Sequence, residues 1–297
     1  MERKLTEITL PCPAKINRFL KIIGRREDGY HLLQTVFQFL NYGDEIRLQA
    51  RQDDQIILFP APLMGIPTEH NLIYRAACAL QQAAGIHQGV SLEITKNIPL
   101  GAGLGGGSSN AATTLIGLNA LWQLHWPLED LLRLGLTLGA DVPVFIQGQA
   151  AFAQGIGEIL TPIEIDEPWI LLLLPDCQVS TPKMYSDEDL TRDSQPLRME
   201  ALSNGEIGRL LSELGNDFEP LVRRHYAAVD EAMIWLSNYS AAMLSGSGAS
   251  VFACFQTQEQ ANLVAQKVPG HMKGIVTKGT NVSSLKQAMK RVCLDLK

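Results

Sequence analysis

The segment that most constrains this chain is PLGAGLGGGSSNAA, residues 99–112, in which five glycines fall within seven positions. Each glycine costs roughly 0.5–1 kcal/mol more than alanine to order in regular structure, so the cluster predicts a backbone that bends sharply or approaches another group closely. A strand-like stretch at 90–99 precedes it, and a helix-like stretch at 108–122 follows, with Ser108 or Ser109 expected to cap the helix. Loop N–H groups and a helix dipole together favour an anion. The segment therefore predicts a phosphate-binding loop, with a plain turn or hinge as the alternative.

The composition is that of an ordinary globular protein. At 297 residues the chain is long for one hydrophobic core, which favours two domains. A net charge of -6, from 25 Lys and Arg against 31 Asp and Glu, argues against nucleic-acid and membrane-surface partners. Five scattered cysteines without a C-x-x-C pair, and a first segment without a secretory signal, favour free thiols in the cytoplasm. The longest apolar run, WILLLL at 169–174, is too short to cross a bilayer and predicts a buried strand.

Hydrophobic periodicity predicts a mixture of strands and helices that alternate in the first half of the chain. DEIRLQA at 44–50 and DQIILFP at 54–60 predict a hairpin. The acidic, loop-like stretch EIDEP at 164–168 predicts a boundary between an N-terminal domain at 1–163 and a C-terminal domain at 164–297. Helices are expected at 71–85, ending at Gly85, at 128–139, ending at Gly139, and at 206–214 and 226–237.

Several known phosphate loops do not fit residues 99–112. GAGLGG matches the dinucleotide fingerprint G-x-G-x-x-G, but it does not open a βαβ unit, and the next acidic residues, Glu129 and Asp130, head a helix instead of ending a strand. A P-loop needs a closing Gly-Lys-Ser/Thr, and a protein kinase needs H-R-D and D-F-G elements, none of which the sequence contains. The loop therefore belongs to another class of phosphate binder.

Three motifs, in this order, resemble those of the GHMP small-molecule kinases: PCPAKINRFL at 11–20, PLGAGLGGGSSNAA at 99–112 and LSGSGASVF at 244–252. The glycine loop alone is typical of the whole superfamily. GRREDGYH and GLTLGADVPVF go further, because they resemble the members that phosphorylate 4-diphosphocytidyl-2-C-methyl-D-erythritol in non-mevalonate (MEP) isoprenoid biosynthesis. The similarity extends over nearly the whole chain and is weakest from about 185 to 215.

The resemblance implies an α+β fold of two lobes, an N-terminal ribosomal-protein-S5-domain-2-like lobe and a C-terminal ferredoxin-like lobe, with ATP and a cytidine substrate meeting between them. ATP is then the phosphoryl donor, Mg²⁺ is expected to arrive with it, and no carboxylate cluster indicates a metal site of the protein's own. The absence of a long heptad repeat favours a monomer or a weak homodimer. The residues expected to contact ATP are Asn71, Leu72, Lys96, Pro99, Gly101, Gly103, Leu104, Gly105, Gly106, Gly107, Ser108 and Ser109.

Asp141 and Lys15 match the catalytic positions of the family. Phosphoryl transfer to an alcohol needs an in-line hydroxyl, charge stabilisation and a proton acceptor. The resemblance implies that Asp141 accepts the hydroxyl proton and that Lys15 orients Asp141 and offsets developing charge. The alternatives are a turn cap before Pro143 for Asp141 and a solvated strand lysine for Lys15. Asn17, two residues beyond Lys15, shares its strand face and is expected to position the substrate.

A second group of residues is expected at the cytidine end of the substrate. Tyr30 and His31 follow an Asp-Gly turn, and Tyr185 ends the stretch STPKMY. By resemblance, Tyr30 and Tyr185 sandwich the cytosine ring, His31 reads its edge, and Thr181 and Pro182 lie beside the substrate. Stacking tolerates any base, so discrimination must come from the polar contacts. Taken singly, these residues would be ordinary aromatic and structural side chains.

Three other functions stay open at this point. A GHMP kinase acting on homoserine, mevalonate or a sugar has no evident use for GRREDGYH, and a nucleotide-binding regulator has no need of both Lys15 and Asp141. A dinucleotide-dependent oxidoreductase is the third.

The loop at 245–250 is expected either to add hydrogen-bond donors near the phosphates or to form a tight turn. The acidic stretch at 187–193 is expected to be a solvated loop.

Overall fold

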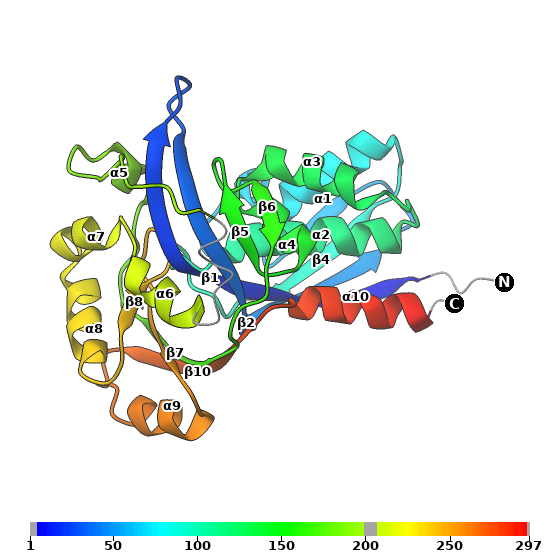
Figure 1. Ribbon diagram of the computed structural model, residues 1–297. Helices are drawn as coiled ribbons and strands as arrows, with labels where there is room; N and C mark the ends of the chain where they lie inside the picture. The colour runs from blue at the N-terminus through cyan, green and yellow to red at the C-terminus, as the bar shows by residue number, and fades with distance from the viewer. Residues whose placement is uncertain (1–4, 199–206, 296–297) are drawn as a thin grey trace.

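The computed structural model describes residues 5–198 and 207–295, which form one mixed sheet flanked by helices (Figure 1). The strands are β1 (Glu7–Arg25), β2 (His31–Ala50), β3 (Ile56–Phe59), β4 (Val90–Thr95), β5 (Ala151–Gln154), β6 (Ile159–Pro162), β7 (Trp169–Leu174), β8 (Ala242–Leu244), β9 (Val251–Phe255) and β10 (Lys273–Thr280). The helices are η1 (Thr68–His70), α1 (Leu72–Ala84), α2 (Gly106–Leu121), α3 (Leu128–Leu138), α4 (Val142–Gln147), α5 (Thr181–Ser186), α6 (Ile207–Leu214), α7 (Glu219–His225), α8 (Ala227–Ser237), α9 (Gln258–Ala265) and α10 (Ser284–Asp295). The expected α+β fold is confirmed.

Strand β2 organises the sheet. The strand order is β3-β4-β2-β10-β7-β9-β8, and β2 also pairs with β1 and β5. Strands β1 and β2 form a long antiparallel hairpin that extends well beyond its neighbours (Figure 1). Because β10 pairs with β2 through Gly279 and Thr280, a strand from the C-terminal half joins the sheet of the N-terminal half. The domain division at residue 163 stays a prediction.

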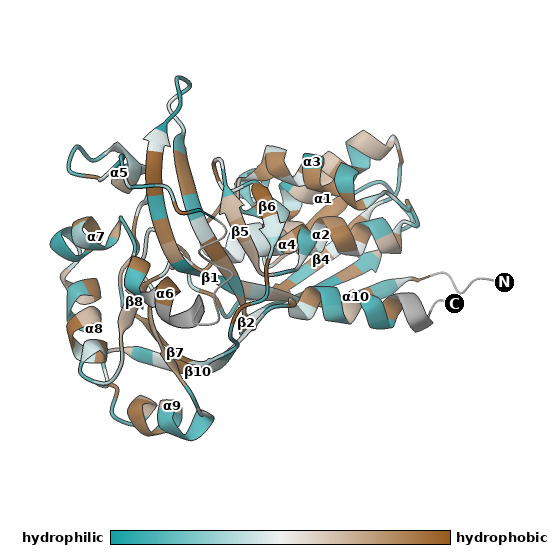
Figure 2. Ribbon diagram, in the orientation of Figure 1, coloured by the Kyte–Doolittle hydropathy of each residue, from teal (hydrophilic) through white to brown (hydrophobic). Residues whose placement is uncertain are grey.

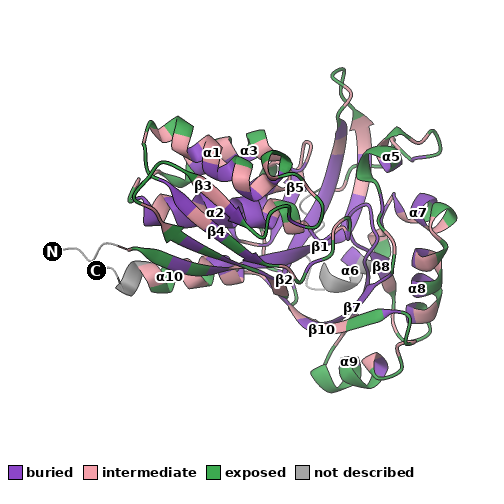
Figure 3. Cartoon of the chain, turned by 180° about the vertical axis from the view of Figure 1, so that it is seen from behind, coloured by how far each residue is buried: buried purple, intermediate pink, exposed green. Residues whose placement is uncertain are grey.

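Apolar side chains close both sides of this arrangement. Helix α2 packs on β1 and β2, α1, α3 and α4 pack around α2, and a separate apolar cluster lies under α7, α8 and α9. Figure 2 shows apolar residues along the strands and α2, and Figure 3 shows the same elements mostly buried, with α9 largely exposed. At Gly117 an added Cβ would lie 2.3 Å from Leu48 Cδ1, so glycine lets α2 lie directly against the sheet. This contact holds the C-terminal half of α2 close to the sheet.

Most of the expected elements are present. Helix α1 ends at Gly85, which adopts a left-handed conformation, and α3 ends at Gly139. Strand β4 alternates as expected, β7 is the buried WILLLL strand, and α6 and α8 occupy the expected helical segments. Residue 206 of the expected helix lies outside the described residues. The cysteines with described side chains, Cys12, Cys78, Cys177 and Cys254, are free thiols as expected, while the Cys293 side chain lies outside the described part.

The expected hairpin between 44–50 and 54–60 is wrong. Strand β3 pairs in parallel with β4, and β4 lies between β3 and β2. Strand β4 pairs with six residues of β2, whereas β3 has only four residues and takes the outer edge. Gly89 permits this crossing, because a Cβ there would lie 2.4 Å from the Gln55 carbonyl oxygen.

The expected serine cap of α2 is also wrong. The helix begins earlier, at Gly106, and its N-cap residue is Gly105, with φ 69° and no side-chain hydrogen bond. Ser109 is fully buried within the helix, and its Oγ has no hydrogen-bond partner within the described residues. The glycines themselves therefore enter the helix and leave its first N–H groups without a capping side chain.

Within the described residues, no helix is long and apolar enough to cross a membrane.

We expect the central strands to account for much of the stability. Leu172 on β7 is fully buried, so Leu172→Ala should lower the free energy of unfolding by about 2–5 kcal/mol through the cavity that it leaves. Leu263 on α9 is 61% exposed, so Leu263→Ala should change it by less than about 0.5 kcal/mol. Urea unfolding followed by circular dichroism measures both, and equal losses would contradict this packing.

Candidate active site

The glycine loop reaches its position through left-handed backbone conformations. The φ values of three glycines lie in the left-handed region, which residues with a Cβ rarely adopt: 65° at Gly101, 73° at Gly103 and 69° at Gly105. At Gly103 an added Cβ would lie 2.2 Å from the Ser245 carbonyl oxygen and 2.7 Å from that of Gly248. Glycine is required here both for conformation and for close approach to the 245–250 loop.

Hydrogen bonds join these two loops. The N–H groups of Ala249 and Ser250 donate to the carbonyl oxygens of Gly101 and Ala102, each at 3.1 Å. Ser245 Oγ donates to the Gly103 carbonyl at 3.0 Å. Carbonyl groups of the glycine loop are thus satisfied by the 245–250 loop, which holds the glycine loop in one shape.

The start of α2 is open toward a cleft of about 420 Å³. No backbone partner is found within the described residues for the N–H groups of Gly106, Gly107 and Ser108, and the first intrahelical bond of this end is from Ser109 N–H to the Gly105 carbonyl at 2.8 Å. All three residues with free N–H groups line the cleft. Unpaired N–H groups at a helix start, reinforced by the helix dipole, form a site for a phosphate oxygen.

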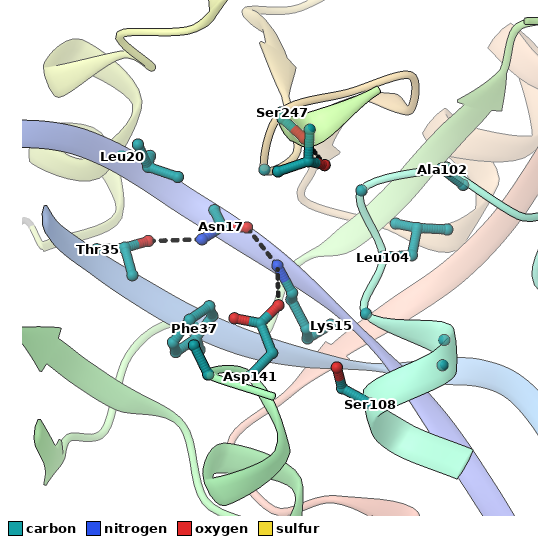
Figure 4. Close-up of a pocket in the computed structure, with 18 of the residues that line it drawn as sticks. Lys15, Asn17, Leu20, Thr35, Phe37, Ala102, Leu104, Ser108, Asp141 and Ser247 are labelled. Carbon is teal, nitrogen blue, oxygen red and sulfur yellow. Dashed lines mark hydrogen bonds and ion pairs between the residues drawn. The ribbon is translucent and has the colours of Figure 1, made fainter. Parts of the chain in front are cut away.

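Lys15 and Asp141 face one another across this cleft (Figure 4). Lys15 Nζ lies 3.3 Å from Asp141 Oδ2 and donates to Asn17 Oδ1 at 2.7 Å. Asn17 Nδ2 donates in turn to Thr35 Oγ1 at 2.8 Å, and Lys15 Nζ lies 5.1 Å from the ring centroid of Phe37. The lysine side chain is 5% exposed and the aspartate 34%, so the ammonium is fixed while the carboxylate is open to the cleft.

The local backbone explains how these side chains are aimed. The β1–β2 register shifts between Pro13 and Lys15 and again between Asn17 and Leu20, and such bulges redirect the side chains beside them. The Lys15 N–H also donates to the Leu104 carbonyl at 3.0 Å, which ties β1 to the glycine loop. Asp141 occupies the N-cap position of α4, but its side chain forms no capping hydrogen bond and points to Lys15 instead.

Lys96 lines the cleft but is held by its own partners. It forms a close ion pair with Asp44 and donates to Asn110 Oδ1 at 3.1 Å. Asp44 is fully buried and also accepts from the N–H groups of Asn97 and Ile98, at 2.7 and 2.8 Å. This network fixes the end of β4, where the chain enters the glycine loop.

The other expected ATP contacts divide into two groups. Asn71 does not line the cleft, because it is buried and its side chain caps α1 by accepting from the Ile73 N–H at 2.9 Å. Ser109 does not line it either. The residues that do line it are Leu72, Lys96, Pro99, Gly101, Gly103, Leu104, Gly105, Gly106, Gly107 and Ser108.

The residues expected at the cytidine end are only partly brought together. Tyr185 and Thr181 line the cleft, and Thr181 Oγ1 lies 2.6 Å from Ser247 Oγ. The His31 ring stacks on Tyr185 with centroids 4.8 Å apart, outside the cleft lining itself. Tyr30, beyond the end of the hairpin, is 59% exposed and does not line the cleft. Pro182 is exposed on α5 and does not line it either.

Two of these aromatic groups have shifted pKa values. Burial lowers the pKa of His31, and the nearby charges of Arg192 and Arg25 lower it further. Burial raises the pKa of Tyr185, and the charge of Asp141 adds to this effect. Both groups are therefore neutral near pH 7.

Sequence reasoning missed several residues of the site. Thr35 and Phe37 line the cleft and alternate on β2, a pattern that predicts a shared strand face but does not indicate which residues they contact. Ser247, within the loop expected either near the phosphates or as a tight turn, lines the cleft as well. The expectation of a merely solvated loop at 187–193 is wrong for two residues, since Leu190 is buried and Arg192 contacts His31. No group of three or more His, Cys, Asp or Glu side chains suited to a metal occurs within 5–198 and 207–295.

Two family models match the chain. The GHMP kinases N terminal domain matches residues 71–149, and the GHMP kinases C terminal domain matches residues 199–274. A 4-diphosphocytidyl-2-C-methyl-D-erythritol kinase of Pseudomonas aeruginosa (strain LESB58) is 49% identical over 278 residues, covering 94% of this chain and 96% of the relative. The enzyme of the same name from Nitrosococcus oceani is 49% identical over 281 residues, covering 95% and 98%.

Solved structures show the same fold. A crystal structure of 4-(cytidine 5'-diphospho)-2C-methyl-D-erythritol kinase superposes with a TM-score of 0.76 at 30% identity, covering 92% of this chain and 99% of that one. A homoserine kinase from Cytophaga hutchinsonii superposes with a TM-score of 0.63 at 18% identity, covering 96% and 98%, and shows a shared fold alone. The expected GHMP kinase fold is thereby confirmed.

The contact between the two loops generates a test with a matched control. Gly103 and Gly65 have similar φ values, 73° and 78°, but a Cβ at Gly65 would meet no atom within 4 Å. Gly65→Ala should therefore cost only the left-handed strain, about 1 kcal/mol, whereas Gly103→Ala should cost about 3 kcal/mol because the loops must separate. Urea unfolding compares them, and similar losses would contradict the close approach.

Proposed function

Because the chain belongs to the GHMP kinase family and, within it, to the 4-diphosphocytidyl-2-C-methyl-D-erythritol kinases, we propose that Lys15 and Asp141 serve transfer of the ATP γ-phosphoryl group to the 2-hydroxyl of that compound. The chain is a small-molecule kinase with ATP as phosphate donor, acting in MEP isoprenoid precursor biosynthesis. The observation that supports the proposed residues is the Lys15–Asp141 pair, which lines the same cleft as the start of α2, where three N–H groups have no backbone partner among the described residues.

The proposed step is an in-line displacement. The 2-hydroxyl oxygen forms a bond to the γ-phosphorus, the bond from that phosphorus to the bridging oxygen of ADP breaks, and the hydroxyl proton passes to the Asp141 carboxylate. Asp141 orients the hydroxyl and accepts its proton late, because an ordinary aspartate is a weak base for an alcohol. Lys15 keeps Asp141 in place and offsets negative charge on the phosphoryl oxygens.

The glycine loop is proposed to hold the ATP phosphates. Gly106, Gly107 and Ser108 line the cleft, and their N–H groups have no backbone partner among the described residues. Lys96, which is ion-paired with Asp44, lies at the loop entrance. Mg²⁺ would be held chiefly by the phosphates, with Ser108 as a neighbouring oxygen ligand, and would neutralise phosphate charge. Asn71 and Ser109 are proposed to act only through the shape of α1 and α2.

The cytidine end is proposed to bind beside α5. Tyr185 and Thr181 line the cleft there, and His31 stacks on Tyr185, so an aromatic ring and a polar edge are available together. Tyr30 and Pro182 are proposed to complete this subsite when the substrate is bound, with Asn17 positioning the acceptor end. We further propose a cytoplasmic monomer or weak homodimer with lobes at 1–163 and 164–297.

Asp141→Asn tests the proton acceptor. The amide cannot accept the hydroxyl proton, so kcat should fall by about 10²–10⁴-fold while ATP binding persists. Asp54→Asn, which changes an exposed carboxylate outside the cleft, should leave kcat unchanged. ADP release and ATP titration measure the two quantities, and an Asp141→Asn enzyme with wild-type kcat would contradict the assigned role.

The acceptor is tested separately with the wild-type chain. ADP release should depend on 4-diphosphocytidyl-2-C-methyl-D-erythritol and stay at background with homoserine, mevalonate or galactose. Release with one of those three and not with the cytidine compound would reject this acceptor. ATP binding without turnover on any of them would favour a regulator.

A further inference from the structure

Arg192 is a fully hydrogen-bonded side chain beside the cytidine end of the cleft. Its five N–H groups are directed to one imidazole and to carbonyl groups of the chain just before it. The acceptors are His31 Nε2 at 3.1 Å, the Asp187 carbonyl at 2.6 Å, the Tyr185 and Leu190 carbonyls at 3.1 Å each and the Glu188 carbonyl at 3.4 Å.

These contacts hold the guanidinium in one orientation. Four backbone carbonyls of the 185–190 segment fix its NH1 and NH2 groups, which leaves Nε–H for His31 alone. The same segment provides the Tyr185 ring, which stacks on His31. Arg192 has no free N–H with which to bind a diphosphate, so it can affect the site only by its hydrogen bond to His31.

The bond from Arg192 selects one form of the imidazole. A guanidinium donates and never accepts, so His31 Nε2 accepts, the ring is neutral, and its hydrogen lies on Nδ1. The charged groups that face the ring are Arg192 and Arg25, both cations that oppose protonation. Nδ1 has no hydrogen-bond partner among the described residues and is not one of the fully enclosed polar atoms. It is therefore available to a ligand as a donor.

We propose that Arg192 is a positioning residue for base selection, which holds His31 as the Nδ1–H tautomer so that the imidazole donates to N3 of the cytosine ring. This inference rests on the proposed function, since it concerns the cytidine end of that substrate. Cytosine N3 is an acceptor and matches this donor, whereas N3 of uracil carries a hydrogen and opposes it. The Arg192–His31 pair thus discriminates between two bases that stack equally well on Tyr185.

The test compares variants at two arginines of the same region. Arg192→Met removes every donor, and Arg192→Lys restores a positive charge with three donors but not the planar five-donor guanidinium. Arg224→Met is the control, because Arg224 is exposed and bonds to Asp189 of the same segment at 2.6 Å without contacting His31. All are made in the full chain. Each is measured for kcat and KM with the cytidine substrate and with its uridine counterpart, and for melting temperature.

The tautomer is read directly by long-range ¹H–¹⁵N NMR of the histidine rings, with His31→Gln identifying the signal. The wild type should show hydrogen on Nδ1, and Arg192→Met should show a mixture with Nε2–H. In Arg192→Met the His31 signal should also titrate at a higher pH, because a cation has been removed.

The kinetic measurements on Arg192→Met should show KM for the cytidine substrate about tenfold higher and kcat within about twofold of the wild type. The preference for cytidine over uridine should fall about tenfold. Arg192→Lys should recover part of both, and Arg224→Met should match the wild type.

An Nε2–H tautomer in the wild type would overturn the proposal, whether or not Arg192→Met folds. The proposal would also be overturned if Arg192→Lys and Arg192→Met kept the wild-type preference for cytidine over uridine. It would equally be overturned if kcat fell in proportion to the loss in melting temperature while the His31 tautomer stayed the same. A wild-type chain that shows Nδ1–H but no ADP release with the cytidine substrate would contradict the proposed function and the cytosine contact, while the Arg192–His31 tautomer bond would stand.

Discussion

The backbone contact between the glycine loop and the 245–250 loop determines where everything else in the site can lie. Gly103 approaches the Ser245 and Gly248 carbonyls more closely than any residue with a Cβ could, and hydrogen bonds from Ala249 and Ser250 hold that approach. The next residues, Gly106 to Ser108 at the start of α2, line the cleft, and their N–H groups have no backbone partner among the described residues. Segments far apart in sequence thus build the candidate phosphate site, which accounts for so many costly glycines in one loop.

The acceptor side depends on a different constraint, which is the register of β1 against β2. Two register shifts bracket Lys15 and Asn17 and aim both into the cleft, where Thr35 and Phe37 of β2 hold them. Asp141 then meets a cation that is almost fully buried and already oriented. A preorganised charge in a restricted cleft stabilises a phosphoryl transition state more than a mobile surface lysine would.

Periodicity and glycine signals in the sequence were sufficient for most single elements, including α1, α3, β4 and β7. They failed where contacts between distant residues determine the structure. Gly89 allows β4 to lie between β2 and β3, so β3 does not pair with β2. Gly105 is the N-cap of α2, so the helix begins before the serines. The candidate site followed from motif resemblance more than from local pattern. Arg192 could not be found in that way, because its partner His31 lies 161 residues away in the chain.

The most direct test of this account is a crystal structure with a non-hydrolysable ATP analogue and 4-diphosphocytidyl-2-C-methyl-D-erythritol bound together. The account predicts phosphate oxygens on the N–H groups of Gly106, Gly107 and Ser108, and the 2-hydroxyl within hydrogen-bond distance of Asp141 and in line with the γ-phosphorus. Phosphates bound away from the start of α2, or a 2-hydroxyl that contacts neither Asp141 nor Lys15, would contradict it.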